Sequence, residues 1–314
     1  MYETISYKFV ECDANVENLS FFSESMATIS CRISQARVTL LRAGSSIRSC
    51  RFSSSLTSVH DAEGVRNITM TAPKTRNALS LGMLHELQEH MIRLPAEIRC
   101  VVLSGQGPAF SSGHNLKELT SARGRQHHQL VFETCSRLML DMQGLDVPII
   151  AQVDGVAAAA GCQLAASCDI VLATPRSSFS TPGGSIGLFC STPGIAVSRA
   201  VPRRVAAHLL LTGLPMSGEE ALRAGLVSRL VEPEQLQRET AHTAAAIVRK
   251  SRAVIALGKR FFYQQLELPI EEAYRLGSKV MVDNIALCDG QEGIRSFIDK
   301  REPTWTHSDE KAHD

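Results

Sequence analysis

Two short stretches of small residues each follow an apolar run and lead into a turn. They read AFSSGH at residues 109–114 and AAAAG at residues 157–161. Backbone N–H groups at a helix start, free of bulky side chains, can point at an oxygen atom that gains negative charge. Two such groups form an oxyanion hole, which stabilises the enolate that forms from a thioester carbonyl. The alternative interpretation of the second stretch is an alanine-rich helix packed in the core.

Strands and helices alternate around these stretches. The predicted strands are 65–70, 100–103, 148–153, 170–172 and 226–231. The first predicted helix starts after the N-cap Ser80 and stops before Pro95, and others span 127–144, 161–168 and 193–213. A short helix follows the capping box of Ser217 and Glu220. Helical patterns then continue from Pro233 to about Arg301, with breaks near Ser251, Pro269 and Asp289. Strands that alternate with helices predict the α/β class.

The composition argues against several classes of protein. Of 314 residues, 44% are apolar and 21% are charged, which is typical of a soluble globular protein with a sizeable core. The net charge of +1 gives no overall field that would attract nucleic acid. The nine cysteines show no spacing typical of a zinc site, so we predict no metal, and several lie in apolar segments as reduced thiols do. No apolar run reaches 18 residues, so we predict no membrane span.

The N-terminal region, residues 1–60, differs from the rest and is predicted to be disordered. From Met26 to His60 there is no Asp or Glu, while five arginines and nine serines are present. This composition is typical of an organelle transit peptide, which we assign to residues 26–56 with a processing site at Arg51-Phe52-Ser53. Such a signal should begin at the N-terminus, so translation starting at Met26 rather than Met1 is one explanation. A basic disordered tail is the other.

Four motifs, in order, resemble those of the crotonase family, also called the enoyl-CoA hydratase/isomerase superfamily. They are PKTRNAL at 73–79, FSSGHNLK at 110–117, the segment from Asp154-Gly155 to Asp169, and ALRAGLV at 221–227. The resemblance covers residues 60–305. It implies a spiral of ββα units over 61–250 and a C-terminal helical region over 251–305 that trimerises, giving a homotrimer or a dimer of trimers. We expect residues 306–314 to be a disordered tail.

The resemblance also implies an acyl-CoA thioester as substrate or ligand, with no metal and no cofactor. The oxyanion donors fall on the backbone N–H groups of His114 and Ala160, where the second is usually a glycine; a role for the His114 imidazole stays open. Active hydratases of the family use two glutamates, and here Gln163 and Gly183 stand in their places. No Asp or Glu lies between Asp169 and Glu219 to replace them. We therefore expect very low hydratase activity.

Other side chains near this region could bind or react. Cys190 is either a nucleophile or a buried structural thiol, and the sequence contains no obvious base beside it. The resemblance assigns the CoA phosphates to basic residues, which could equally be ordinary surface charges: Lys74, Arg76, Lys117 and, from a neighbouring subunit, Lys259.

Three functional hypotheses follow. The first is an acyl-CoA-binding protein of fatty-acid metabolism in the mitochondrial matrix that lacks ordinary hydratase activity. The second is another reaction of CoA thioesters that uses the oxyanion hole: decarboxylation, which produces an enolate without a base, or hydrolysis by a water held by Gln163. The third is a non-catalytic oligomeric scaffold.

Overall fold

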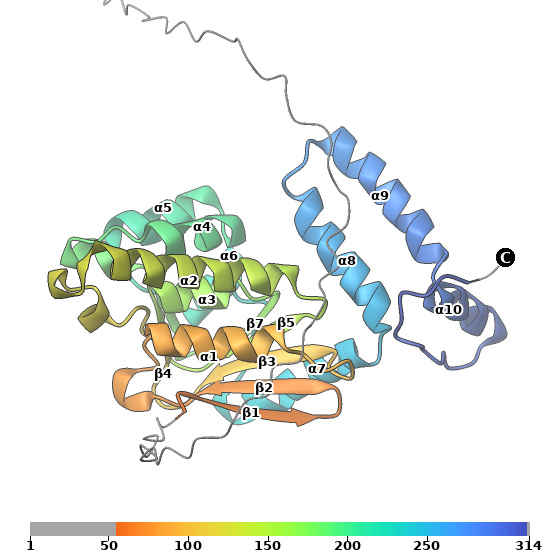
Figure 1. Ribbon diagram of the computed structural model, residues 1–314, viewed down its shortest axis with the longest axis horizontal. Helices are drawn as coiled ribbons and strands as arrows, with labels where there is room; N and C mark the ends of the chain where they lie inside the picture. Colours follow the sequence, from red (N-terminus) through yellow and green to blue (C-terminus); the bar gives the residue numbers. More distant parts are fainter. Residues whose placement is uncertain (1–54, 313–314) are drawn as a thin grey trace, which may run out of the picture. The chain divides into compact units, whose positions relative to one another are not determined.

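The computed structural model describes residues 55–312 and contains two sheets (Figure 1). The larger sheet has the strand order β1-β2-β3-β5-β7-β10. Its strands are β1 (Thr57–Ala62), β2 (Val65–Met70), β3 (Cys100–Gly105), β5 (Ile149–Val153), β7 (Ile170–Ala173) and β10 (Arg229–Leu230). β1 is antiparallel to β2, and the remaining neighbours are parallel. Both faces of such a sheet must therefore be covered.

The smaller sheet has the order β4-β6-β8-β9. Its strands are β4 (Ala109–Ser111), β6 (Val156–Ala158), β8 (Ser178–Ser180) and β9 (Met216–Ser217), of which only β9 is antiparallel to its neighbour. From β3 to β8 successive strands alternate between the sheets, and each pair (β3 and β4, β5 and β6, β7 and β8) precedes a helix. This repeated ββα unit confirms the predicted α/β class and its crotonase-type arrangement.

Ten α-helices complete the described part of the chain. They are α1 (Leu81–Ile92), α2 (Gly124–Gly144), α3 (Ala160–Ala166), α4 (Ser191–Ala200), α5 (Arg203–Thr212), α6 (Gly218–Ala224), α7 (Leu236–Val248), α8 (Arg252–Gln265), α9 (Ile270–Ile285) and α10 (Cys288–Asp299). The predicted caps are present: Ser80 Oγ accepts from Met83 N, and Ser217 and Glu220 form a capping box. The C-terminal helices break near Ser251, Pro269 and Asp289, as predicted.

The hydrophobic core lies on both faces of the larger sheet. Along β3, Val101 and Leu103 join the large cluster that includes α1 and α2, whereas Cys100 and Val102 join a smaller cluster with α7. Alternate side chains of a strand point to opposite faces, so β3 is buried on both sides. The sheet thereby provides a rigid support for the loops that follow its strands.

Three sequence predictions differ from the structure. The folded region begins at Thr57 rather than near Gly64, because β1 pairs with β2. The helix predicted from Pro193 to Gly213 is two helices, because Pro202 has no N–H to continue α4. In the tail predicted to be disordered, 306–314, residues 306–312 are instead bound to the fold: Asp289 accepts hydrogen bonds from the N–H groups of Thr306 (2.7 Å) and His307 (2.9 Å).

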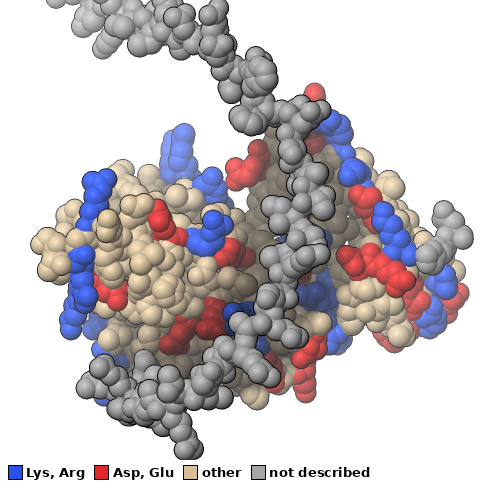
Figure 2. All heavy atoms as spheres, in the orientation of Figure 1, with Lys and Arg blue, Asp and Glu red and all other residues tan. Residues whose placement is uncertain are grey.

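The N-terminal region predicted at 1–60, with its transit peptide at 26–56, lies outside the described residues except for its last few positions. Within residues 55–312, no helix is long and apolar enough to cross a membrane, and no group of His, Cys, Asp and Glu could hold a metal ion. Basic and acidic side chains are intermixed on the face in Figure 2, in keeping with the net charge of +1.

Candidate active site

The first predicted oxyanion loop is fixed by a buried asparagine. The Asn77 side chain accepts from Ala72 N (3.0 Å) and donates to the carbonyls of Gln106 (3.0 Å) and Ala109 (2.9 Å). Ser111 Oγ donates back to the Asn77 carbonyl at 2.8 Å. These bonds hold the loop before α1 against β4 and the turn that precedes it. The sequence analysis assigned no role to Asn77, although its place as a polar residue in the turn motif at 73–79 could have indicated one.

The two predicted oxyanion donors come together at this loop. His114 forms a parallel bridge with Leu79, which bonds to the residues flanking His114 and leaves the His114 N–H facing the other way. The second stretch packs against this loop, since a Cβ atom added to Gly113 would be 3.0 Å from Ala160 N. Ala160 is the first residue of α3, so its N–H has no acceptor within the helix. The segments that carry the two predicted donors are therefore in contact.

The turn before Ala160 is strained. Ala159 has φ +49° and ψ −119°, a conformation that glycine adopts freely and that costs other residues about 1–3 kcal/mol. The next residue, Gly161, packs so closely on the Ser111 carbonyl that a side chain would overlap it. The run of alanines is therefore a tight turn pressed against the first loop, and an ordinary core helix does not account for it.

Gln163 lies one helical turn after Ala160, on the face of α3 that borders a cavity. Its side chain is 4% exposed, and among residues 55–312 its Oε1 atom has no hydrogen-bond partner. An amide can accept and donate hydrogen bonds, but it cannot remove a proton from water at neutral pH.

The backbone leaves no room for a side chain at position 183. A Cβ atom added to Gly183 would overlap the Leu188 carbonyl oxygen and lie 2.7 Å from Cys190 Sγ. The Gly183 N–H donates to this sulfur at 3.3 Å. Burial raises the pKa of the Cys190 thiol, and the Gly183 N–H opposes this rise only in part. Cys190 is therefore a protonated, buried thiol in the space that a side chain at 183 would need.

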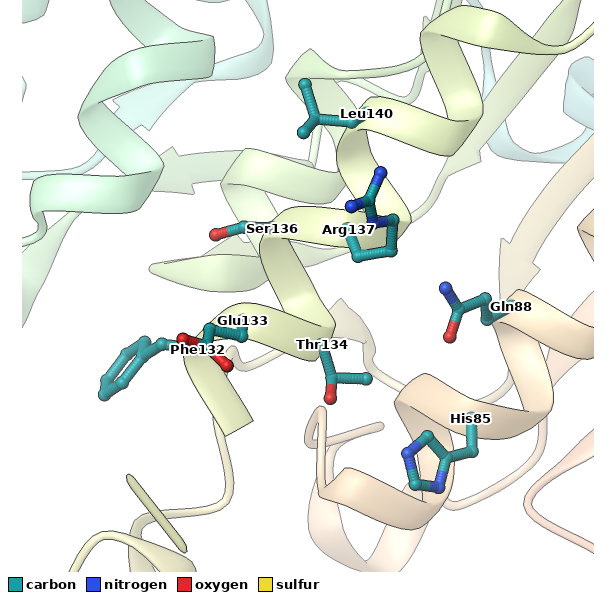
Figure 3. A pocket seen from close by; sticks show the side chains of 8 residues that line it. All are labelled: His85, Gln88, Phe132, Glu133, Thr134, Ser136, Arg137 and Leu140. Carbon is teal, nitrogen blue, oxygen red and sulfur yellow. The ribbon is translucent and has the colours of Figure 1, made fainter. Parts of the chain in front are cut away.

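The His114 imidazole is packed rather than free to act. Its Nδ1 lies 3.4 Å from the Leu79 carbonyl, and its ring meets Phe132 edge to face at 5.0 Å. Burial lowers its pKa, so the ring is neutral at physiological pH. Phe132 also lines a groove of about 580 Å³ between α1 and α2, in which Gln88 and Arg137 extend from opposite sides (Figure 3). The groove is lined by none of the predicted site residues.

The predicted phosphate-binding residues divide into two groups. Lys74 and Arg76 are exposed on the loop before α1 and Lys117 on the loop after β4, and none has an ion-pair partner in the described chain. The loops are joined by the Ser112 N–H, which donates to the Arg76 carbonyl at 2.9 Å.

Lys259 does not fit the phosphate role that we predicted. Its ammonium is buried and donates to the carbonyls of Met142 (2.9 Å) and Val147 (3.0 Å) and to Asp169 Oδ2 (2.8 Å). These three bonds use all its N–H groups. The Tyr263 hydroxyl donates to the other Asp169 oxygen at 2.7 Å. Lys259 therefore joins α8 to the core as one partner of a buried ion pair.

Comparisons with known proteins agree with this geometry. The model of the enoyl-CoA hydratase/isomerase family matches residues 60–308. The chain is 53% identical, over 80% of its length and 85% of the relative, to the Mus musculus "Enoyl-CoA hydratase domain-containing protein 3, mitochondrial". It is 30% identical, over 76% of its length and 86% of the relative, to a "Probable enoyl-CoA hydratase, mitochondrial" of Dictyostelium discoideum.

Solved structures are similar over the same region. The crystal structure of human enoyl-CoA hydratase domain-containing protein 3 superposes with a TM-score of 0.79 at 51% identity, covering 80% of this chain and all of that one. The crystal structure of an enoyl-CoA hydratase from Mycobacterium smegmatis superposes with a TM-score of 0.77 at 42% identity, covering 80% of this chain and 98% of that one. The chain therefore belongs to the enoyl-CoA hydratase/isomerase family.

Proposed function

We propose that this protein binds acyl-CoA thioesters in the mitochondrial matrix, as part of fatty-acid metabolism, and lacks ordinary enoyl-CoA hydratase activity. The observation that carries the proposal is the packing of the Gly113–His114 loop against the turn at Ala160, beside a position, Gln163, that cannot act as a base. The names of its mitochondrial relatives support the location. Exposed Lys74, Arg76 and Lys117 are the proposed partners of the CoA phosphates.

Loss of hydration follows from what surrounds the oxyanion hole. Hydration needs a group that takes a proton from water and a group that gives one to carbon, and each contributes roughly 100- to 10,000-fold. Gln163 supplies neither, and Gly183 has no side chain and no room for one. The sequence contains no carboxylate between Asp169 and Glu219 that could take over.

The test combines binding with turnover. We expect decanoyl-CoA to raise the melting temperature of the purified protein, since a ligand at a hundred times its Kd stabilises by about 2.7 kcal/mol. We expect hydration of crotonyl-CoA to stay near background. Robust hydration would contradict the loss of activity, and absence of any thermal shift would favour the scaffold hypothesis.

A matched pair of glycine variants tests the oxyanion hole itself. Gly113→Ala places a methyl group 3.0 Å from Ala160 N at a residue with φ +87°, so we expect it to weaken decanoyl-CoA binding at least tenfold. Gly124→Ala is the control, because Gly124 has a similar φ of +77° and no atom within 4 Å of the added methyl. It measures the backbone strain alone and should leave binding intact.

Decarboxylation is the second candidate. An oxyanion hole without a carboxylate base suits a reaction in which loss of CO2 creates the enolate directly. Release of CO2 from malonyl-type CoA thioesters measures it, and hydrolysis is followed in the same samples as free CoA. Inactivity on all of them would leave binding as the function.

We also propose a homotrimer or a dimer of trimers. The C-terminal helices carry large apolar side chains that are mostly exposed in the single chain, such as Phe297 (85%), Tyr274 (74%) and Ile270 (70%). Exposed apolar surface of this kind is typical of protein interfaces. Light scattering of the purified protein measures the mass, and a monomer at micromolar concentration would contradict the proposal.

A further inference from the structure

The C-terminal strap, which we define as residues 304–312, connects α10 to the rest of the chain. Near its start the Trp305 Nε1–H donates to the Arg249 carbonyl at 2.9 Å, just before α8. Near its end Lys311 forms an antiparallel bridge with Leu287, between α9 and α10. The strap therefore joins the beginning of α8 to the junction of α9 and α10.

A buried carboxylate holds the middle of the strap. Asp289, in the first turn of α10, is 1% exposed. It accepts hydrogen bonds from the Thr306 N–H (2.7 Å), the Thr306 hydroxyl (2.8 Å) and the His307 N–H (2.9 Å). Burial raises the pKa of this carboxyl, but the hydrogen bonds from Ser251 and from the strap outweigh burial and keep the pKa below its ordinary value. Asp289 is therefore a charged anchor for the strap at neutral pH.

The His307 side chain connects the strap to two further elements. Its Nδ1 atom lies 3.2 Å from the backbone nitrogen of Arg252, the first residue of α8. Its Nε2 atom lies 2.9 Å from Nη1 of Arg99, which directly precedes β3. Arg252 Nε also donates to the Ile98 carbonyl at 3.2 Å. One imidazole ring thereby links the strap to α8 and to the start of a central strand of the larger sheet.

Both partners of this ring are hydrogen-bond donors, so the contact depends on the charge of the ring. A neutral imidazole has one nitrogen that accepts a hydrogen bond, whereas both nitrogens of the imidazolium donate. Protonation would therefore remove the hydrogen bond that the ring accepts and place a cation against the Arg99 guanidinium. The charged groups that face the ring are Arg99, Asp289 and Arg252. Burial and Arg99 lower the pKa of His307, Asp289 opposes them and Arg252 adds to them.

The strap bears on the position of α9 and α10. Of the elements in residues 55–312, α9 and α10 pack mainly on α8 and on each other. They carry the exposed apolar side chains, such as Tyr274 and Phe297, that we propose to lie between subunits. Through Arg99 the strap ties this pair of helices to the larger sheet, and its release would leave them held by α8 alone.

We propose that the strap is a pH-sensitive device, held closed by the neutral His307 imidazole and released by its protonation, which keeps α9 and α10 in the position that assembly requires. The role in assembly rests on the proposed homo-oligomer. Above pH 6.5, the ordinary pKa of histidine, the ring is neutral in the closed and in the released strap, so the contact is at full strength. Below it the released strap binds the proton more tightly, and the ratio of released to closed strap rises by up to about tenfold for each pH unit.

Trp305 provides the assay, because it lies in the strap and is the only tryptophan among the 314 residues. From pH 7.5 to pH 5.5 we expect its emission to shift to longer wavelength and its quenching by acrylamide to become faster. Far-UV circular dichroism of the same samples shows whether the helices persist. Light scattering should show a fall in mean mass over the same pH range.

Two variants and a matched control isolate the imidazole. His307→Lys places a permanent cation against Arg99, so at pH 7.5 it should show the Trp305 emission that the unaltered protein shows at pH 5.5. His307→Gln cannot be protonated, so its emission should be the same at both pH values. His242→Gln makes the same exchange at an exposed histidine of α7 and should behave like the unaltered protein.

The outcomes separate the inference from the proposed function. Trp305 emission and quenching that are the same at both pH values, or a change that persists in His307→Gln, overturn the pH-sensitive strap. Release of the strap without a fall in mass overturns its role in assembly. A monomer at pH 7.5 contradicts the proposed homo-oligomer, whereas a pH-dependent Trp305 signal in that monomer still supports the release of the strap.

Discussion

A methyl group added at Gly183 should destabilise the protein far more than one added at its neighbour Gly184. In Gly183→Ala the new Cβ overlaps the Leu188 carbonyl oxygen and approaches Cys190 Sγ to 2.7 Å. Overpacking usually costs about 1–3 kcal/mol, and we expect about 3 kcal/mol here because the carbonyl belongs to the backbone and cannot rotate away. For a domain of this size that lowers the melting temperature by roughly 6–12 °C.

Gly184→Ala is the control, since an added Cβ there has no atom within 4 Å. Its effect should stay within about 0.5 kcal/mol, the usual range for surface substitutions. Thermal and urea unfolding of both variants gives the comparison. Equal stability of the two would refute the reasoning, because it would mean that the loop leaves space at 183. A further consequence is that Gly183→Glu together with Gln163→Glu should not restore hydratase activity unless the loop around Leu188 also changes.

Two further predictions concern backbone strain and pH. Ala159→Gly should raise the free energy of unfolding by about 1 kcal/mol, because glycine adopts the conformation at φ +49° without strain. The control Ala158→Gly in β6 should lower it by about 0.5–1 kcal/mol. A change of the same sign in both variants, measured by chemical unfolding, would contradict the strain. Burial lowers the pKa of His307 from its ordinary value of 6.5, helped by Arg99 and Arg252 and opposed by Asp289. The folded state thus binds this proton less tightly than the unfolded state, so the free energy of unfolding should fall as the pH drops below 6.5. Between pH 7.5 and pH 5.5, His307→Gln should lose less of its free energy of unfolding than the unaltered protein does.

The predictions from sequence succeeded where local pattern decides the structure. Apolar periodicity and capping residues located α1 and the C-terminal helices, because these signals depend on neighbouring residues in the chain. The pairing of the two small-residue stretches was also predictable, since each follows a buried strand. By contrast, β1 was missed because its outer face is exposed and its pattern is weak.

The failures concern contacts between distant segments. Lys259 looks like any surface lysine in sequence, and only the fold brings Asp169 and two backbone carbonyls within 3.0 Å of its ammonium. The strain at Ala159 arises because the turn must fit against Gly113 and Ser111 from another unit of the spiral. Neither effect has a signature in local composition.

These long-range contacts also explain how binding and proton transfer would separate under the proposed function. The segments that carry the proposed oxyanion donors are held by backbone packing and by the buried side chain of Asn77, and none of these contacts involves the side chains at 163 and 183. An amide at 163 in place of a carboxylate would therefore remove the proposed base without disturbing this packing. At position 183 a side chain is excluded altogether, because the Leu188 carbonyl oxygen and Cys190 Sγ occupy the space that a Cβ atom would need. A buried thiol with a raised pKa and a neutral amide supply hydrogen bonds and shape but no charge. Under the proposed function, such a site distinguishes ligands by the hydrogen bonds that they form and does not support reactions that require a carboxylate base.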